Sequence, residues 1–543
     1  MAQLAHELVE AVAAWAPGAA ALRHGAERIS YAGLAGAIAA CGAALQALGL
    51  AEGERVAVRL PASATAVTAL LGASGAGCAF VALDPHGEPG AGAAFLRASG
   101  ARLLVTDPAG LDALEELLED CPSLRTVVLH GGAAPRACPV PVLAWEDFLA
   151  SAIQAGPPAP AAATLGALVH TAAVGGAAGR MLALSHRNLV AGAVSTARCL
   201  GIRQGDRVLA ALPFHGDDGL NVLLAAFSAG ATAVLDMVPA APRALAAGAG
   251  PDHAALAGLL ERGDITGIVA LPATWQALAG HDLGRAADCL RYAACAGGGL
   301  AGEALAALRQ ALPRTRIHLL YDVGDACRST SLTPAQLDER PCSIGRALPY
   351  SDWLVVRADG SECAPGETGE LVRRGAQVAL GYWNDARASA EHFRFLPPAP
   401  GLAGRATGYW PGVGARKDLD GYLYLSEGRN DTITSGGFRI SGREVEKIVV
   451  GTGLVAEAAA VGVAHPVLGQ VIAVLATPRR GARLDSTILF GACRARLPQH
   501  MLPAMVDVRR SPLPRARDGQ IDRALLAGEL APLFADVALH AAP

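Results

Sequence analysis

The sequence lacks the residue pairings that mark a metal-binding or disulfide-rich protein. Its eleven cysteines are scattered over 543 residues, with no CxxC pair and no cysteine–histidine spacing suited to zinc. This pattern argues against a zinc ribbon and against a disulfide framework. Cysteines used in this way fit a reducing compartment, and we therefore expect a cytoplasmic protein.

Blocks of like charge and long apolar runs are also missing. The formal net charge is −4 and is spread along the chain, which leaves no basic surface for nucleic acid or an anionic membrane. The longest apolar stretch, ALLGASGAGCAFVAL at 69–83, is shorter than the roughly 18 residues of a membrane span. Residues 1–25 lack the basic start of a secretory signal. We expect a soluble protein that acts on small molecules or proteins.

The chain shows an alternating pattern of strands and helices. RVAVRL at 55–60 precedes the helical pattern ATAVTALLGASGA at 64–76, and RVLAALP at 207–213 is another short apolar run. Strands that alternate with helices indicate parallel βαβ units and an α/β fold. A chain of 543 residues is too long for one core, so at least two domains are expected.

The pattern changes from about residue 350. Asp-Gly and Pro-Gly turns separate short strands in DWLVVRADGSECAPGETGELVRRG at 352–375, which indicates a small antiparallel sheet or barrel. Beyond a polar joint near Gly428 the sequence is typical of a compact α+β unit. The predicted domains are 1–428, with the parallel sheets and the barrel-like subdomain, and 429–543, a smaller mobile domain.

Several stretches occur in an order typical of one enzyme superfamily. They are ISYAGL (29–34), SHRNLVAG (185–192), LPFHGDDGLN (212–221), LRYAACAGGGLA (290–301), YDVGDACRSTSL (321–332), DGYLYL (420–425) and LPRARDGQIDRALL (513–526). Over residues 28–527 the chain resembles the AMP-forming acyl-CoA ligases of the adenylate-forming (ANL) superfamily, closest to the exosortase A-associated acyl-CoA ligase type. The resemblance implies that ATP and Mg²⁺ activate a carboxylic acid as acyl-AMP. The acyl group then passes to the thiol of CoA or phosphopantetheine, with a carrier protein as the alternative acceptor.

The phosphate loop of that family reads Thr-Ser-Gly-Ser/Thr-Thr-Gly-x-Pro-Lys-Gly. Residues 172–181 occupy its place and read AAVGGAAGRM, without a hydroxyl group. Backbone N–H groups around Gly175 and Gly176 can still form an anion nest, and Arg180 keeps a positive charge at the lysine position. A connection without a ligand remains the alternative, because glycine richness alone is a weak signal.

The next family motif, Tyr-Gly-x-Thr-Glu, supplies a phosphate contact through its threonine and a Mg²⁺ ligand through its glutamate. Here Tyr321 is retained, Gly324 replaces the threonine and Asp325 replaces the glutamate. By this resemblance Asp325 is the candidate metal residue and reaches the ion through water. A capped or solvated turn is the alternative role for Asp325.

Two further family contacts are substituted. Val413 stands where the ribose-binding aspartate belongs, and a second register puts Tyr409 there; neither has a carboxylate. Gln520 replaces the adenylation lysine of the C-terminal motif. Loss of one preorganised donor costs about 3 to 4 kcal/mol in the transition state, so we predict strongly impaired adenylation. Restoration should require Gln520→Lys, Val413→Asp and Gly324→Thr together.

The resemblance also assigns a hinge and an acyl pocket. Arg429 matches an ATP-site position of the Gly-Arg-x-Asp motif, and Asn430 and Asp431 form the hinge, although an ordinary linker reads the same way. The residues expected around the acyl group are His215, Gly216, Asp217, Cys295, Gly297 and Gly298. His215 is in addition a candidate base oriented by Asp217 or Asp218, with pocket lining as the alternative.

Three functions remain open from the sequence. The favoured one is a pseudoenzyme or repurposed protein that keeps an acyl, thiol or carrier-protein site. The second is a working ligase with a divergent site that uses Arg180 and Asp325. The third is ATP-independent acyl transfer or condensation with His215 as base. Release of pyrophosphate distinguishes the second function, and transfer from a thioester without ATP distinguishes the third.

Overall fold

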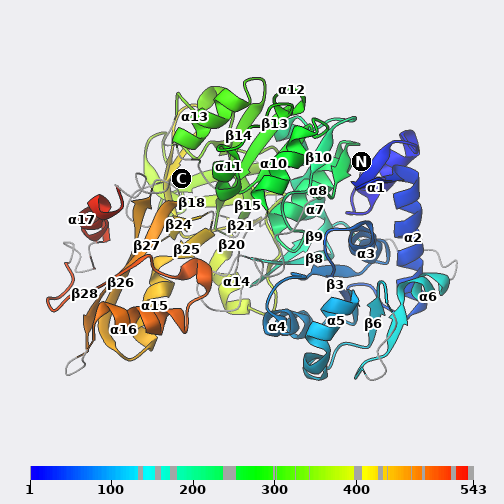
Figure 1. The fold of residues 1–543 in the computed structure, drawn as a ribbon, viewed down its shortest axis with the longest axis horizontal. Coiled ribbons are helices and arrows are strands. Elements are labelled where there is room, and N and C mark those ends of the chain that lie inside the picture. Colours follow the sequence, from blue (N-terminus) through cyan, green and yellow to red (C-terminus); the bar gives the residue numbers. More distant parts are fainter. Residues whose placement is uncertain are drawn as a thin grey trace.

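A computed structural model describes most of the chain. The described residues are 2–132, 138–152, 161–171, 180–236, 252–297, 300, 302–324, 326–340, 343–396, 406–425, 432–436, 438–465, 468–479, 484–514, 521 and 523–535. They form two large sheets, a small antiparallel sheet and a separate C-terminal sheet, with helices packed against them (Figure 1). The fold is therefore the mixed α/β architecture that the sequence predicts, with a large N-terminal part and a smaller C-terminal domain.

The first large sheet has nine strands in the order β16-β15-β14-β13-β12-β10-β11-β1-β2, parallel from β14 to β1 and antiparallel at both edges. Its strands are β1 (Ala20–His24), β2 (Glu27–Ser30), β10 (Arg207–Leu209), β11 (Thr232–Val234), β12 (Gly267–Ala270), β13 (Tyr292–Ala296), β14 (Arg316–Val323), β15 (Ala326–Leu332) and β16 (Arg346–Ala347). Helices α10 (His253–Glu261), α11 (Pro272–Leu278), α12 (Ala286–Cys289) and α13 (Gly302–Ala311) share an apolar cluster with one face of this sheet. The central strands are apolar on both sides because both faces of the sheet are covered.

The second large sheet has eight strands in the order β19-β9-β8-β4-β3-β5-β6-β7. Its strands are β3 (Arg55–Arg59), β4 (Ala79–Ala82), β5 (Leu103–Thr106), β6 (Thr126–Leu129), β7 (Val142–Ala144), β8 (Leu165–His170), β9 (Met181–Ser185) and β19 (Gly381–Tyr382). Along the chain, helices α4 (Pro89–Ser99), α5 (Pro108–Leu114) and α6 (Trp145–Ala150) follow strands β4, β5 and β7. The largest apolar cluster takes residues from both large sheets and from α1 (Glu7–Trp15), α2 (Tyr31–Ala47), α3 (Ala64–Gly75), α7 (His186–Leu200) and α8 (Asp217–Ser228). These helices therefore join the two sheets through one core.

One buried polar contact ties the N-terminus to this core. The Ser74 hydroxyl lies 2.9 Å from Nδ1 of His6 and 3.5 Å from Nδ1 of His186, the first residue of α7. Ser74 and His186 are fully buried. Burial lowers the pKa of His186 to about 4, because the charged imidazolium would lose its hydration there.

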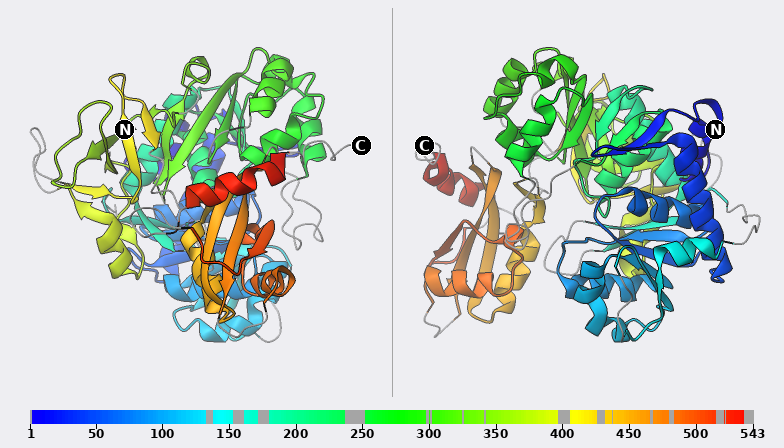
Figure 2. Two further views of the ribbon diagram at one scale, coloured as in Figure 1. Left: turned by 90° about the vertical axis from the view of Figure 1, so that its left-hand side faces the viewer. Right: turned by 45° about the vertical axis from the view of Figure 1, so that its right-hand side comes forward.

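The small antiparallel sheet confirms the change of pattern seen near residue 350. Its order is β20-β21-β18-β22-β23, and β17 pairs with β18. The strands are β17 (Ser351–Val356), β18 (Thr368–Gly375), β20 (Phe393–Phe395), β21 (Thr407–Tyr409), β22 (Gly414–Lys417) and β23 (Leu423–Leu425), and α14 (Ala386–His392) precedes β20. Figure 2 shows this yellow-green region lying against the N-terminal sheets.

The C-terminal sheet has the order β25-β24-β27-β26, with β28 parallel to β27. It consists of β24 (Thr432–Ser435), β25 (Phe438–Ser441), β26 (Val455–His465), β27 (Gly469–Pro478) and β28 (Met505–Val508), with α15 (Gly442–Gly451), α16 (Ser486–Arg494) and α17 (Arg523–Ala535). Two apolar clusters of its own cover the two faces of this sheet. Figure 2 shows it as a separate orange and red lobe. The predicted boundary at residue 428 falls outside the described residues and stays a prediction.

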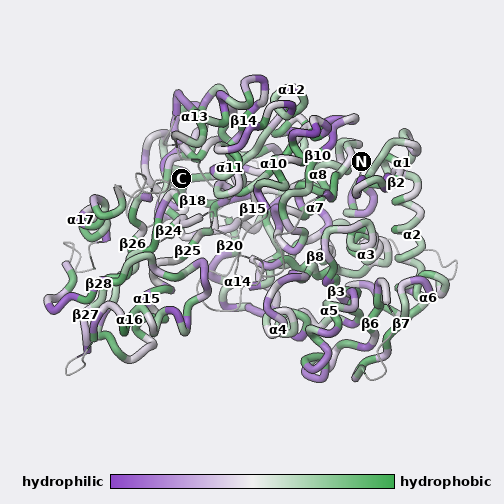
Figure 3. Tube along the Cα trace, in the orientation of Figure 1, coloured by the Kyte–Doolittle hydropathy of each residue, from purple (hydrophilic) through white to green (hydrophobic). Residues whose placement is uncertain are grey.

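Hydropathy changes over short distances along the trace (Figure 3). Within the described ranges no helix is both long enough and apolar enough to cross a bilayer.

Candidate functional site

The end of β8 lies beside the loop that precedes α8. β8 ends at His170, one residue before the glycine-rich stretch, and α8 begins at Asp217 with Gly216 as its N-cap. An isolated parallel bridge joins His170 to Gly216. The carboxyl end of a strand from the second sheet therefore meets the loop that follows β10 of the first sheet. This is the edge at which α/β proteins bind ligands.

His215 lies in this junction and pairs with a residue that sequence reasoning missed. Its Nε2 is 3.8 Å from Oδ2 of Asp84, which follows β4, and its side chain is 25% exposed. Burial lowers the pKa of His215, while the negative charge of Asp84 acts in the opposite direction. The sequence analysis proposed Asp217 or Asp218 as the orienting residue. The ion pair found in the structure is with Asp84, which is 131 positions before His215 and has no motif to link it to that residue.

His170 shares this environment. Burial, together with the nearby His215, lowers its pKa to about 4. Its ring meets Phe95 of α4 edge to face, with ring centroids 4.3 Å apart. His170 is therefore a neutral side chain at pH 7 with an apolar neighbour on one side.

The turn at Gly324 is crowded. Gly324 has a φ of 63°, a backbone conformation that favours glycine. A Cβ atom at this position would collide with the Tyr409 hydroxyl and would lie 3.1 Å from Cβ of Pro411. Tyr321 is retained next to this turn, where burial raises its pKa to about 12. A tyrosine side chain from β21 thus lies against Gly324, the position that the resemblance assigns to the phosphate-binding threonine.

The two registers for the ribose position have different surroundings. Val413 is 7% exposed and belongs to the apolar cluster of the small sheet, together with Val323, Leu371 and Ala415. Tyr409 is 4% exposed and reaches the Gly324 turn. Both residues therefore lie in the apolar cluster that holds Val323, and Tyr409 is the one whose side chain reaches Gly324.

Arg180 contacts β19 and the segment that follows it. Its Nε lies 3.6 Å from Oδ2 of Asp385, and its guanidinium lies over the ring of Tyr382, 5.0 Å from the ring centroid. Nearly half of the side chain is exposed. Cation–π and ion-pair contacts of this kind fix Arg180 against the segment that follows β19.

Cys295 is a core residue. It is fully buried in the cluster formed with α10, α11 and α13, and burial raises the pKa of its thiol. Its strand neighbours Ala294 and Ala296 belong instead to the cluster with α7 and α8, because successive side chains of a strand face opposite sides. The expectation that Cys295 lines the acyl pocket is thereby corrected. Gly297 has a φ of 87° and donates its N–H to the Leu320 carbonyl at 3.1 Å.

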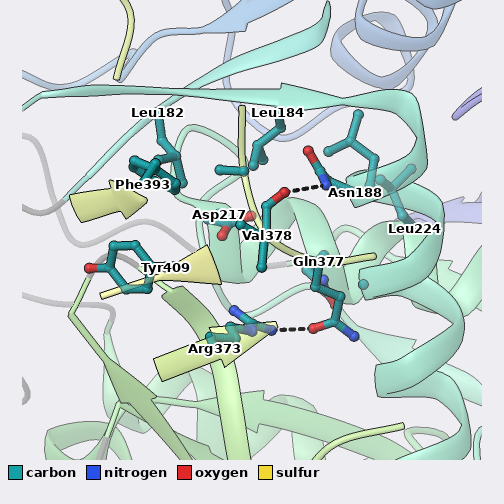
Figure 4. Close-up of a pocket in the computed structure, with 14 residues that line it drawn as sticks. Leu182, Leu184, Asn188, Asp217, Leu224, Arg373, Gln377, Val378, Phe393 and Tyr409 are labelled. Carbon is teal, nitrogen blue, oxygen red and sulfur yellow. Dashed lines mark hydrogen bonds between the residues drawn. The ribbon is translucent and has the colours of Figure 1, made fainter. Parts of the chain in front are cut away.

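A cavity that sequence reasoning missed lies between α7, α8 and the small sheet (Figure 4). Asp217 lines it, together with Arg373 of β18 and Tyr409. Arg373 donates to the Gln377 side chain, and Nδ2 of Asn188 donates to the Val378 carbonyl at 2.8 Å. The cavity volume is ≈ 40 Å³, which suffices for a few water molecules and not for an acyl chain.

Eight predicted site positions lie outside the described residues. They are Gly175, Gly176, Gly298, Asp325, Arg429, Asn430, Asp431 and Gln520. Among the residues that the structure does describe, no group of three or more histidine, cysteine or acidic side chains is arranged to hold a metal ion. The candidate magnesium residue Asp325 therefore stays an expectation from the resemblance.

Comparison with known proteins identifies the family. Residues 9–383 match the family model of the AMP-binding enzymes, and residues 444–520 match that of the AMP-binding enzyme C-terminal domain. A sulfoacetate–CoA ligase from Cupriavidus necator is 30% identical over 503 residues, with 91% of each chain covered. An indoleacetate–CoA ligase from Aromatoleum aromaticum is 28% identical over 527 residues, with 95% of this chain and 96% of the relative covered.

A solved structure shows the same fold. The amide bond synthetase McbA from Marinactinospora thermotolerans superposes with a TM-score of 0.74 at 21% sequence identity, over 97% of this chain and 99% of the synthetase. Two family models and relatives that span the whole chain agree with the order of motifs in the sequence. The chain belongs to the AMP-binding enzyme family, the AMP-forming acyl-CoA ligases of the ANL superfamily.

Proposed function

We propose that this protein has lost most or all of its ability to form an acyl-adenylate and acts on an acyl thioester of CoA or phosphopantetheine. The family reaction requires ATP and Mg²⁺, whose phosphates and ribose need charged and hydroxyl-bearing partners. The described residues at those positions are apolar, aromatic or engaged elsewhere. An acyl thioester needs none of these contacts, because its acyl group is already activated.

The observation that carries this proposal is the position of Tyr409. Its side chain occupies the space that a side chain at position 324, the predicted threonine position, would need. Tyr409 is also one of the two residues that replace the ribose-binding aspartate. In the register through Tyr409, one side chain both replaces the carboxylate and fills the adjoining space, and residues of this kind do not fit a nucleotide as the family binds it.

Three further residues support the same conclusion. Val413, the other residue at the aspartate position, is packed in the apolar cluster of the small sheet and offers no hydrogen bond from its side chain. Arg180 is paired with Asp385 and stacked on Tyr382, so its use on a phosphate would require breaking both contacts. Gln520, by its chemistry alone, supplies no positive charge during adenylation.

Acid-dependent exchange of pyrophosphate into ATP tests the proposal. We expect no exchange above background with a broad set of carboxylic acids, which would include sulfoacetate, indoleacetate and fatty acids. Competition between a fluorescent acyl-pantetheine and acyl-CoAs should in contrast show saturable binding. Acid-dependent exchange in the unmodified protein would support a working ligase with a divergent site instead.

Restoration of the site gives a matched variant series. The triple variant combines Tyr409→Asp with Gly324→Thr and Gln520→Lys. Tyr409 is replaced because a threonine at position 324 would collide with its side chain. The triple variant should gain exchange activity, whereas Gln520→Lys alone should not, since binding is lost as well as chemistry. The set Gln520→Lys, Val413→Asp and Gly324→Thr, in which Tyr409 stays, is the control that separates the two registers.

A further inference from the structure

Polar residues stand at the carboxyl ends of three adjacent parallel strands of the second sheet. β8, β4 and β3 are hydrogen-bonded neighbours, and they end at or next to His170, Asp84 and Arg59. The carboxyl edge of a parallel sheet is where α/β proteins place their binding and catalytic groups. His170 and Asp84 lie outside the motifs on which the resemblance rests.

The loop before α8 adds His215 to this edge. The bridge between His170 and Gly216 fixes the loop beside β8, and Nε2 of His215 then faces the Asp84 carboxylate at 3.8 Å. This distance is within ion-pair range and longer than a hydrogen bond, as is common for catalytic pairs without substrate. The contact on Nε2 leaves Nδ1 as the ring atom available to accept a proton.

We propose that His215 is a general base for ATP-independent transfer of an acyl group from a thioester, with Asp84 as the residue that positions it. This inference rests on the proposed function. Nδ1 of His215 takes the proton of an acceptor, water or a second thiol, as the acceptor atom bonds to the thioester carbonyl carbon. The carbon–sulfur bond then breaks, and the proton passes from Nδ1 to the departing thiolate. The products are the acylated acceptor and the free thiol, so atoms and electrons balance without a further reactant.

The surroundings keep His215 in the form that a base requires. Burial favours the neutral ring, and the positive charge of a protonated His86 would act in the same direction. Asp84 opposes both effects, so it stabilises the imidazolium that forms during proton transfer. The charges of His215 and Asp84 also act on His170, which is neutral at pH 7. The charge of Asp84 acts in turn on Arg59.

The experiment follows thiol release from acetyl-CoA, hexanoyl-CoA and benzoyl-CoA by the full-length protein without ATP, with water or pantetheine as acceptor. We expect turnover of at least one thioester. His215→Gln should reduce the rate about 100-fold or more, the usual contribution of a general base. His24→Gln, on the exposed end of β1, is the matched control and should leave the rate unchanged.

The role of Asp84 is read from the pH profile. Asp84→Asn should reduce kcat about 10-fold or more, and should move the acid limb of kcat/KM to lower pH, because the charge that raises the pKa of His215 is gone. A merely structural role would lower the rate without moving that limb.

Binding and turnover separate the two proposals. Saturable binding of acyl-CoAs without thiol release would overturn the base assignment and leave the proposed function intact. Turnover that survives in His215→Gln would also overturn it. Absence of both binding and turnover would overturn the base assignment and the proposed function together.

Discussion

Two strand-end regions of this protein have diverged in opposite directions. The region around Gly324 is filled by the Tyr409 side chain and backed by the apolar cluster that holds Val413. The edge around His215 keeps an imidazole next to a carboxylate. The proposed function treats the two regions separately, with nucleotide chemistry lost at the first and acyl chemistry kept at the second.

The largest expected effect comes from Val413→Asp. A carboxylate in the apolar cluster of the small sheet would be an unpaired buried charge, and we expect a loss of about 3 to 5 kcal/mol in the free energy of unfolding. Urea denaturation measures this loss, and Val413→Thr, which has nearly the same shape and no charge, should lose much less. Tolerance of Val413→Asp would show that Val413 faces a solvated nucleotide site after all.

The next effect is a pH dependence of the free energy of unfolding, which comes from the buried histidine at the start of α7. The pKa of His186 is about 4 in the folded protein and about 6.5 in an unfolded chain, so the unfolded state binds more protons between these values. Stability is therefore complete above pH 6.5 and decreases as the pH falls towards 4, by about 3 kcal/mol from this residue. Denaturation at a series of pH values checks the slope.

His186→Gln should reduce that slope by the share of one histidine, because the buried His170 and His318 also have pKa values of about 4, and His24→Gln should leave the slope unchanged. The imidazole signal of His186 in an NMR titration gives a second readout that does not depend on the variant. A His186 ring that titrates near pH 6.5 in the folded protein would contradict the buried-contact account.

A smaller effect is expected from Gly324→Thr in the otherwise unmodified protein. Positive φ and the collision with Tyr409 should together cost about 2 to 3 kcal/mol. Gly412→Thr is a close control, because Gly412 has a φ of 72° and no atom within 4 Å of an added Cβ. Shortening Tyr409 to alanine in the Gly324→Thr variant should recover the part of the loss due to collision. Equal losses at 324 and 412 would mean that the turn has room for the threonine.

The fold was largely predictable from the sequence, because it depends on local patterns. Runs such as 55–60 and 207–213 give strands of the two parallel sheets, and the turns at 352–375 give antiparallel strands. The order of the sequence motifs also predicted the family. The position of residue 428 as a domain boundary stays a prediction.

The residues of the candidate site were predictable only where a single sequence motif contains all of them. The pairing of His215 with Asp84 depends on how two sheets meet, and no local pattern encodes it. Cys295 was assigned to the pocket because its motif lies there, but strand alternation turns its side chain into the opposite core. The sequence also left two registers for the ribose position, and only packing shows that Tyr409 reaches Gly324.

The central claim, loss of the nucleotide site, is tested most directly by the effect of Mg·ATP on thermal stability. A ligand at a hundred times its dissociation constant stabilises the folded state by about 2.7 kcal/mol, and one below that constant by less than about 0.4 kcal/mol. With Tyr409 against Gly324, we predict that millimolar Mg·ATP shifts the melting temperature of the unmodified protein by less than about 1 °C. A shift of several degrees would contradict the account.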